Sequence, residues 1–125
     1  MGGFFVSILD GKENLRAGRI VETSFHELIK RKVIPNEVLE IWQDKDYSNE
    51  LLGINYPLLL KIQGNENEIS SKVYVNGGAR YWKGIITINS EKYRICNHWY
   101  NDDNRNNIDK YIKWFLENEK KLKDK

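Results

Sequence analysis

The sequence predicts an α+β fold, in which a small, mostly antiparallel sheet is combined with a central cluster of short helices and a C-terminal packing helix. Apolar residues recur at helical spacing between residues 24 and 53 and again beyond residue 106, whereas they alternate as in strands between residues 58 and 97. The chain shows no internal repeat and no linker-like stretch, and 125 residues suffice for one continuous core. Residues 1–125 are therefore expected to form a single α+β domain.

The N-terminal part of the chain is predicted to form two strands. Residues 4–9 are apolar and rich in strand-forming side chains, and Asp10-Gly11 is a typical turn pair. Residues 15–21 are expected to return as a second strand, although Gly18 weakens it.

Three short helices are predicted next. Ser24 is followed three residues later by a glutamate, which is the spacing of a capping box, so a first helix is expected from Ser24 to about residue 32. Pro35 suits the first turn of a second helix, and a third helix over residues 47–52 is expected to end at Gly53. The side chains expected to face the core from the first two helices are Phe25, Leu28, Ile29, Val38, Ile41 and Trp42.

The second half of the chain is predicted to supply the main sheet. Apolar residues alternate over residues 58–62, which indicates a strand, and residues 63–68 are expected to form a polar loop. Residues 72–83 and 84–97 each contain two strand-like segments around a turn signal, so each is expected to form a hairpin.

The second of these hairpins would sort its side chains onto two faces. With a two-residue turn at Asn89-Ser90, Ile86 lies opposite Tyr93. The expected inward residues are Ile86, Ile88, Tyr93 and Ile95, and the expected outward residues are Lys92, Arg94 and Cys96.

The chain is predicted to end in a helix over residues 106–120, reached through a polar linker over residues 101–107. The lysines at its C-terminal end complement the helix dipole. Trp114 lies beside the apolar face, where it either extends the core or marks a surface for a partner. The side chains expected to face inward are Ile108, Tyr111, Ile112 and Phe115.

Positive charge and aromatic side chains are concentrated in residues 69–100. This stretch contains five lysines and arginines against one acid, and six tyrosines and tryptophans, whereas the whole chain has a formal net charge of only +2. Residues 1–62 carry eight cations and nine acids, whereas residues 63–125 carry twelve and nine. Cations beside flat aromatic faces are suited to holding a polyanion and stacking on its bases.

The leading hypothesis is therefore a small, non-enzymatic nucleic-acid-binding module that uses a basic, aromatic-bearing β-hairpin surface. Its cations would contact phosphates, and its tryptophans would stack on bases. The alternative is a protein–protein adaptor or homodimerisation domain that uses exposed aromatics and a sheet edge. The candidate nucleic-acid-binding residues are Lys72, Arg80, Trp82, Lys83, Arg94, His98, Trp99 and Arg105.

Other function classes find less support in the sequence. The helices predicted between residues 24 and 53 suggest a helix-turn-helix, but the second and third would present several acids to DNA. Cys96 and His98 are spaced to share a strand face, yet no third group is marked to orient a catalytic pair. No metal-ligand spacing or phosphate-binding motif occurs, so no cofactor is expected. With a single cysteine and no membrane-length apolar run, a cytoplasmic protein is expected.

Overall fold

The described part of the chain adopts an α+β fold with five helices and two antiparallel sheets. The computed structural model describes residues 6–125. The elements in chain order are α1 (Ala17–Arg31), α2 (Asn36–Trp42), α3 (Lys45–Leu52), β1 (Leu59–Lys61), α4 (Glu66–Val73), β2 (Tyr74–Val75), β3 (Gly78–Ala79), β4 (Ile86–Ile88), β5 (Glu91–Ile95) and α5 (Ile108–Lys121).

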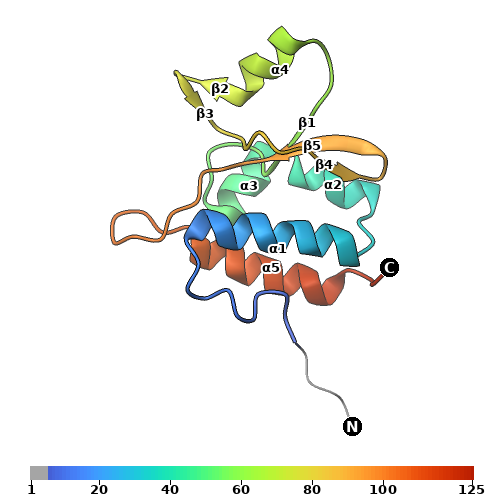
Figure 1. Cartoon of the computed structure of the whole chain (residues 1–125), viewed down its shortest axis with the longest axis vertical. Helices are drawn as coiled ribbons and strands as arrows, with labels where there is room; N and C mark the ends of the chain where they lie inside the picture. The colour runs from blue at the N-terminus through green and yellow to red at the C-terminus, as the bar shows by residue number, and fades with distance from the viewer. Residues whose placement is uncertain (1–5) are drawn as a thin grey trace.

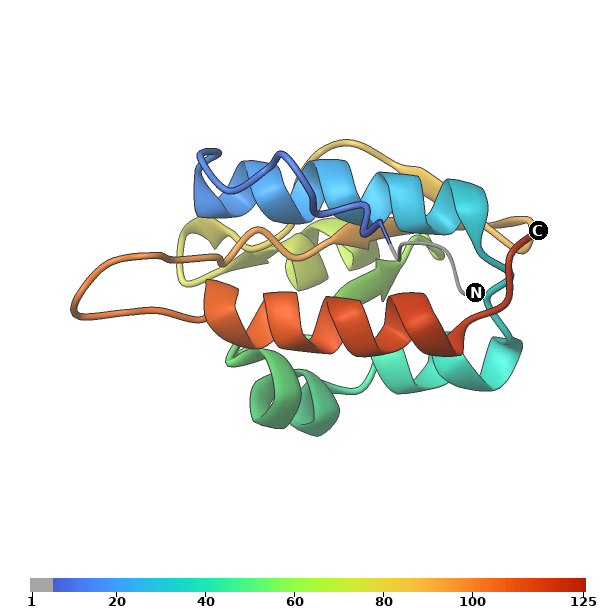
Figure 2. The same ribbon diagram turned by 90° about the horizontal axis from the view of Figure 1, so that it is seen from below.

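The elements are arranged in layers around the sheet formed by β1, β5 and β4. In Figure 1, α4 and the β2–β3 hairpin lie on one side of this sheet, and α1 and α5 lie on the other. Figure 2 shows that α1 and α5 lie side by side and run in the same direction. None of the described helices combines the length and the apolar character that crossing a membrane requires.

Helix α1 corrects two predictions, a strand over residues 15–21 and a helix start at Ser24. Its buried positions already begin at Ala17 and continue at intervals of three and four residues, so the helical period extends further toward the N-terminus than expected. Ser24 therefore lies inside the helix, where its hydroxyl bonds to the Ile20 carbonyl oxygen and lies 2.8 Å from the Tyr111 hydroxyl. The predicted end of this helix is confirmed.

The segment before α1 forms turns where a strand was predicted over residues 4–9, and the first two residues of that strand lie outside the described residues. The segment is fastened to α5 by the carboxylate of Glu119. The Ser7 hydroxyl donates to one oxygen of this carboxylate (2.6 Å), and the Ile8 N–H donates to the other (2.7 Å). Glu119 is only 3% exposed, so these bonds offset part of the cost of burying its charge.

Helix α2 begins where its proline predicts, and helix α3 ends where its glycine predicts. Pro35 directly precedes α2, and Gly53 ends α3 in the left-handed conformation (φ 68°) that glycine adopts without strain. Burial on α2 corrects one predicted core residue, because Ile41 is 44% exposed whereas Leu39 is 3% exposed. Leu39 and Trp42 lie three positions apart, which places both on the inward face of the helix.

The main sheet confirms the predicted hairpin register. Its strand order is β1-β5-β4, both pairs are antiparallel, and Ile86 lies opposite Tyr93. Asn89 and Ser90 form the turn with positive φ angles of 51° and 68°, as in a type I′ turn. The residues predicted to face inward, Ile86, Ile88, Tyr93 and Ile95, are all buried.

The burial of Cys96 corrects one prediction for this hairpin. The residue was expected on the outer face of the hairpin, yet its side chain is completely buried. Strand β5 ends at Ile95, but pairing continues at Cys96 through an isolated bridge to Tyr81, and consecutive Ile95 and Cys96 are both buried, so the chain is covered on both faces here. The N–H of Cys96 donates to the Leu58 carbonyl oxygen (2.9 Å), which keeps the backbone paired where the thiol enters the core.

Helix α4 corrects the polar loop predicted for residues 63–68. Only Val73 of this helix is buried, so the segment offers almost no apolar period from which a helix can be read. The Asn65 side chain caps the helix by accepting from the N–H of Glu68 (2.9 Å). The hairpin predicted over residues 72–83 is shorter than expected and consists of β2 and β3 around a two-residue Asn-Gly turn.

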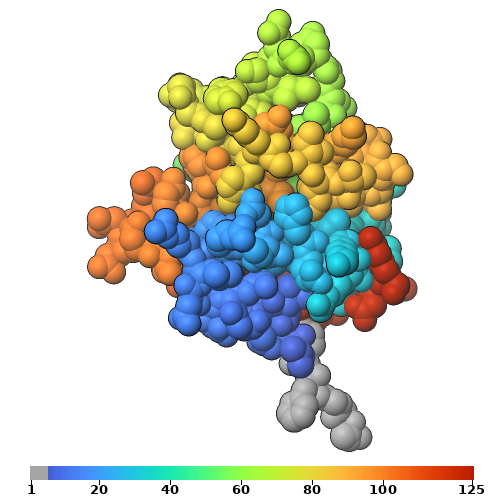
Figure 3. Space-filling view, viewed as in Figure 1, coloured from blue at the N-terminus to red at the C-terminus, as the bar shows by residue number. Residues whose placement is uncertain are grey.

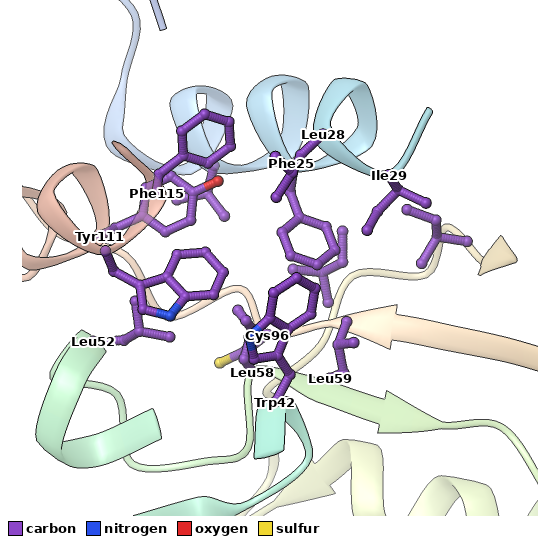
Figure 4. Packing of buried hydrophobic residues seen from close by; sticks show 14 of the residues in the cluster. Phe25, Leu28, Ile29, Trp42, Leu52, Leu58, Leu59, Cys96, Tyr111 and Phe115 are labelled. Atoms are coloured by element: carbon purple, nitrogen blue, oxygen red, sulfur yellow. The ribbon is translucent and has the colours of Figure 1, made fainter. Parts of the chain in front are cut away.

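Helix α5 supplies the aromatic centre of the core. Phe25 contacts Trp42 edge to face, and Trp42 contacts Trp114 in the same way, with ring centroids 5.6 and 5.3 Å apart. Tyr111 lies between Trp114 and Trp99 in the same network. Figure 4 shows side chains from α1, α2 and α5 converging in this core. Trp114 is 3% exposed, so it extends the core, and of the residues predicted to face inward Ile108, Tyr111 and Phe115 are buried and Ile112 is half-buried.

Replacing Glu119 by alanine is expected to lower the free energy of unfolding by about 1–3 kcal/mol, because the Ser7 hydroxyl and the Ile8 N–H lose their acceptor. Urea denaturation followed by circular dichroism measures the change. Glu117→Ala is the matched control, since this exposed residue lies on the same helix and its loss should change stability by less than about 0.5 kcal/mol. Equal stabilities for the two variants would show that the N-terminal segment is not held by Glu119.

Candidate functional site

A cleft of about 440 Å³ opens between the C-terminal end of α3, the residue after β3 and the chain that leads into α5. Residues 101–107 project from the body of the molecule near the N-terminal ends of α1 and α5 (Figures 1 and 2), and the space-filling view in Figure 3 shows this loop standing out beside the start of α1. We call the hollow the cation–tyrosine cleft, defined by Tyr56, Arg80, His98, Tyr100, Arg105 and Lys110.

Arg80 is held in the cleft by three contacts. Its Nη2 donates to the Val75 carbonyl oxygen (2.8 Å), and its Nη1 donates to Nε2 of His98 (3.1 Å). The guanidinium carbon lies 5.5 Å from the centroid of the Tyr56 ring. Because arginine can only donate, Nε2 of His98 must be the acceptor, so this imidazole is neutral and carries its proton on Nδ1.

Arg105 and Lys110 bring two more positive charges to the cleft. The Arg105 guanidinium lies over the Tyr100 ring, 4.0 Å from its centroid, and Lys110 lies in the first turn of α5. The residues found to line the cleft include no aspartate or glutamate. None of the ion pairs within residues 6–125 involves Arg80, Arg105 or Lys110. The three cations are therefore held close to the same hollow without a carboxylate in its wall.

Asn107 ties together the segments that form the cleft. Its side chain is 7% exposed, donates to the His98 carbonyl oxygen (2.8 Å) and accepts from the N–H of Tyr100 (2.8 Å). The same amide also reaches the carbonyl oxygen of Gly53 at 3.4 Å. A Cβ on Gly53 would stand 3.2 Å from the Cβ of Asn107, so glycine gives this contact the room it needs. The cleft thus depends on one buried amide at the start of α5.

The pKa of His98 lies below its ordinary value. Partial burial is the largest cause, and the positive charges of Arg80 and Arg105 lower the pKa further because each repels the protonated ring. The ring also contacts Tyr56 and Tyr100 edge to face, at 5.2 and 6.1 Å between centroids. Rings and cations thus follow one another along the wall of the cleft, with a neutral imidazole in the middle.

The structure brings together three of the eight candidate binding residues. Arg80, His98 and Arg105 all line the cleft, although they come from three separate stretches of the chain. Trp82 lies apart from them and lines a neighbouring hollow. The cations of the set that lie outside both hollows are Lys72 at the end of α4, Lys83 before β4 and Arg94 on the outer face of β5.

Trp99 is placed in the core, although it also borders the hollow that Trp82 lines. It is 6% exposed, its Nε1 donates to the Cys96 carbonyl oxygen (2.7 Å), and its ring packs on Tyr111. The Trp99 ring therefore offers little exposed surface to a base. Trp114 is buried too, so neither of these tryptophans is available to the protein-partner alternative, whereas Tyr74 is 51% exposed.

Patterns in the sequence do not identify Tyr56, Asn107 or Lys110 as members of the site. Tyr56 follows the glycine that ends α3, and Lys110 is one of many lysines near the C-terminus. No motif or spacing joins these residues to Arg80, because folding alone brings the four segments together. Charge and ring content pointed to Arg80, His98 and Arg105, but not to these three residues.

Cys96 and His98 do not form a catalytic pair. The Cys96 thiol is completely buried, and burial raises its pKa to about 12, so the nucleophilic thiolate is scarce near neutral pH. Among the described residues, no group of three or more histidine, cysteine, aspartate or glutamate side chains is placed to hold a metal ion.

Comparison of the chain with protein-family models, with curated proteins and with solved structures found no match. The function is therefore inferred from the chemistry of the cation–tyrosine cleft. The cations, the aromatic rings and the volume of this cleft are the features that support the inference.

The buried thiol of Cys96 is expected to react with iodoacetamide at least about 100 times more slowly in the native protein than in urea at pH 8, because burial disfavours the thiolate and hides the sulfur. Mass spectrometry of timed samples measures the rate. Rapid alkylation of the folded protein would contradict both the burial of the thiol and its raised pKa.

Proposed function

We propose that this protein binds nucleic acid and that the cation–tyrosine cleft holds phosphate groups of the ligand. The observation that supports this most directly is the convergence of Arg80, Arg105 and Lys110 on one hollow with no acid found in its wall. Like charges held close together repel one another, and an anion in the cleft would relieve that repulsion. Guanidinium groups also offer paired N–H donors that match phosphate oxygens.

The tyrosine rings favour a nucleic acid over a simple inorganic anion. Tyr56 and Tyr100 line the same cleft as the cations, and each has a guanidinium near its ring. Such rings can pack against a sugar or stack on a base while the neighbouring cations hold the phosphate. The volume of about 440 Å³ lies in the range of ordinary small-ligand sites, which leaves room for a nucleotide unit.

The proposed binding surface is a cleft and not the hairpin face that the sequence predicts. Arg80, His98 and Arg105 stay in the proposed site, and Lys110, Tyr56 and Tyr100 join it. The candidate cations on α4, before β4 and on β5 would contribute only long-range attraction. A cytoplasmic location forms part of the proposal, because the lone thiol of Cys96 would stay reduced there.

Replacing Lys110 by alanine is expected to weaken binding of a DNA oligonucleotide and to reduce the dependence of affinity on salt. Loss of one phosphate contact should lower the slope of log affinity against log salt concentration by about one. Fluorescence anisotropy of a labelled oligonucleotide over a series of salt concentrations measures both effects. Lys110 is exposed on α5, so its truncation should leave the fold intact.

Lys113→Ala is the matched control for this experiment. Lys113 is exposed on the same helix but lies outside the cleft, and its loss removes the same charge. Equal losses in the two variants would mean that the ligand senses only the overall charge of the protein. If the unmodified protein bound neither DNA nor RNA at low salt, the proposed function would be wrong.

Affinity for an oligonucleotide is also expected to rise as the pH falls below about 6.5, the ordinary pKa of histidine. In the free protein partial burial and, after it, the charges of Arg80 and Arg105 lower the pKa of His98 and keep the ring neutral, whereas a bound phosphate favours the protonated ring. Binding therefore takes up a proton, and the affinity should increase by up to about tenfold for each unit by which the ligand raises the pKa of His98. Protonation also ends the bond from Arg80 to Nε2 and frees that donor for the ligand.

The pH experiment uses oligonucleotides without terminal phosphates, so that the ligand does not titrate between pH 5 and 8. His98→Gln should remove the rise in affinity at low pH, because the glutamine amide places an acceptor near the Nε2 position that Arg80 contacts and cannot be protonated there. His26→Gln, at the other histidine, an exposed residue of α1, should leave the rise unchanged. A rise that survives in His98→Gln would exclude the cleft imidazole as its source.

A further inference from the structure

A second hollow adjoins the cation–tyrosine cleft. Its volume is about 630 Å³, and it lies between the start of α1 and residues 99–102. Tyr100 lines both hollows, so the two share a wall. We call it the tryptophan hollow, defined by Arg16, Arg19, Glu22, Trp82, Tyr100 and Asp102.

Trp82 differs from the other tryptophans of the chain in its exposure. Trp42, Trp99 and Trp114 are 1%, 6% and 3% exposed, whereas Trp82 is half-buried. One ring carbon of Trp82 lies 3.4 Å from the position that a Cβ would take on Gly18. One part of the indole therefore packs on the first turn of α1, and another part borders the hollow. A ring held in this way loses little freedom when a ligand stacks on it.

The charges around the tryptophan hollow nearly cancel. Its wall contains two arginines and two acids, and Arg19 is paired with Glu22 at 2.9 Å. A phosphate would gain little there, because the two carboxylates of the wall balance its two guanidinium groups. The hollow therefore suits an uncharged, flat part of a ligand. The neighbouring cleft, with three cations and no acid found in its wall, suits the charged part.

We infer that the ligand is a single strand of nucleic acid that crosses Tyr100, with a phosphate in the cation–tyrosine cleft and an unpaired base against Trp82. This inference rests on the proposed function and adds the strandedness of the ligand. One hollow is positively charged, and the adjacent one has balanced charge and an aromatic wall. This pair matches the alternation of charged phosphate and flat, uncharged base along one strand. Sequence preference is expected to be weak, because every base has a face that can stack.

A duplex fits this arrangement poorly. Its bases are paired and stacked on one another, so none offers a free face to the Trp82 ring unless it is unpaired first. A duplex could still bring its phosphates to the cleft. The comparison of single strand with duplex therefore separates the strandedness of the ligand from the simple attraction of phosphates.

The first test titrates the unmodified protein with a mixed-sequence DNA strand of about twenty nucleotides and with the stable duplex that it forms with its complement. Tryptophan emission and anisotropy are recorded together at low salt. The single strand is expected to bind at least about tenfold more tightly and to quench the emission, because Trp82 is the tryptophan that a base can reach. Equal or tighter binding of the duplex would overturn the inference and leave the proposed function standing.

The second test uses Trp82→Leu, which keeps an apolar contact on Gly18 and removes the stacking surface. Affinity for the single strand should fall about tenfold, and the quenching should disappear, while affinity for the duplex stays the same. Tyr74→Leu is the control, because this exposed aromatic residue on β2 lies outside both hollows. Unchanged affinity and quenching in Trp82→Leu would overturn the inference, whereas Lys110→Ala would still report on the cleft. If neither ligand bound the unmodified protein, the inference and the proposed function would both fall.

Discussion

The packing of the buried Tyr111 ring is the interaction on which the rest of the fold depends. The ring packs against Trp99, Trp114 and Phe115, and its hydroxyl lies 2.8 Å from that of Ser24 on α1. Burial raises the pKa of Tyr111 well above its ordinary value, so the hydroxyl stays protonated as a hydrogen-bonding group. Because this ring joins α5 to α1 and to the chain after β5, it determines where the N-terminal end of α5 lies.

The cation–tyrosine cleft follows from that placement. Asn107, directly before α5, reaches back to His98 and Tyr100, and its Cβ fits against the glycine that ends α3. The cleft is therefore built on the end of a helix, where Lys110 lies in the first turn, while Arg80 and Arg105 bring charge to it from outside the helices. Such an arrangement holds like charges together at a cost in free energy, which packing elsewhere in the core offsets.

The two hollows suit the two kinds of group, phosphate and base, that alternate along the proposed ligand. The cleft offers charge, and the tryptophan hollow offers a flat apolar surface with nearly balanced charge. Tyr100 belongs to both, and Arg105 lies over its ring at 4.0 Å. A single side chain thus joins the site proposed for phosphate to the site proposed for a base.

Local rules in the sequence determined the elements with strong periods or turn signals. The β4–β5 register, the end of α3 at Gly53 and the inward face of α5 followed from alternation, positive φ and helical spacing. Helix α4 was missed because Val73 is its only buried residue, and a helix without an apolar stripe leaves no pattern to read. The tertiary structure alone decided the site. Charge and ring content pointed to Arg80, His98 and Arg105, but nothing in their spacing showed that Tyr56 and Lys110 join them, since contacts between distant segments depend on how the whole core packs.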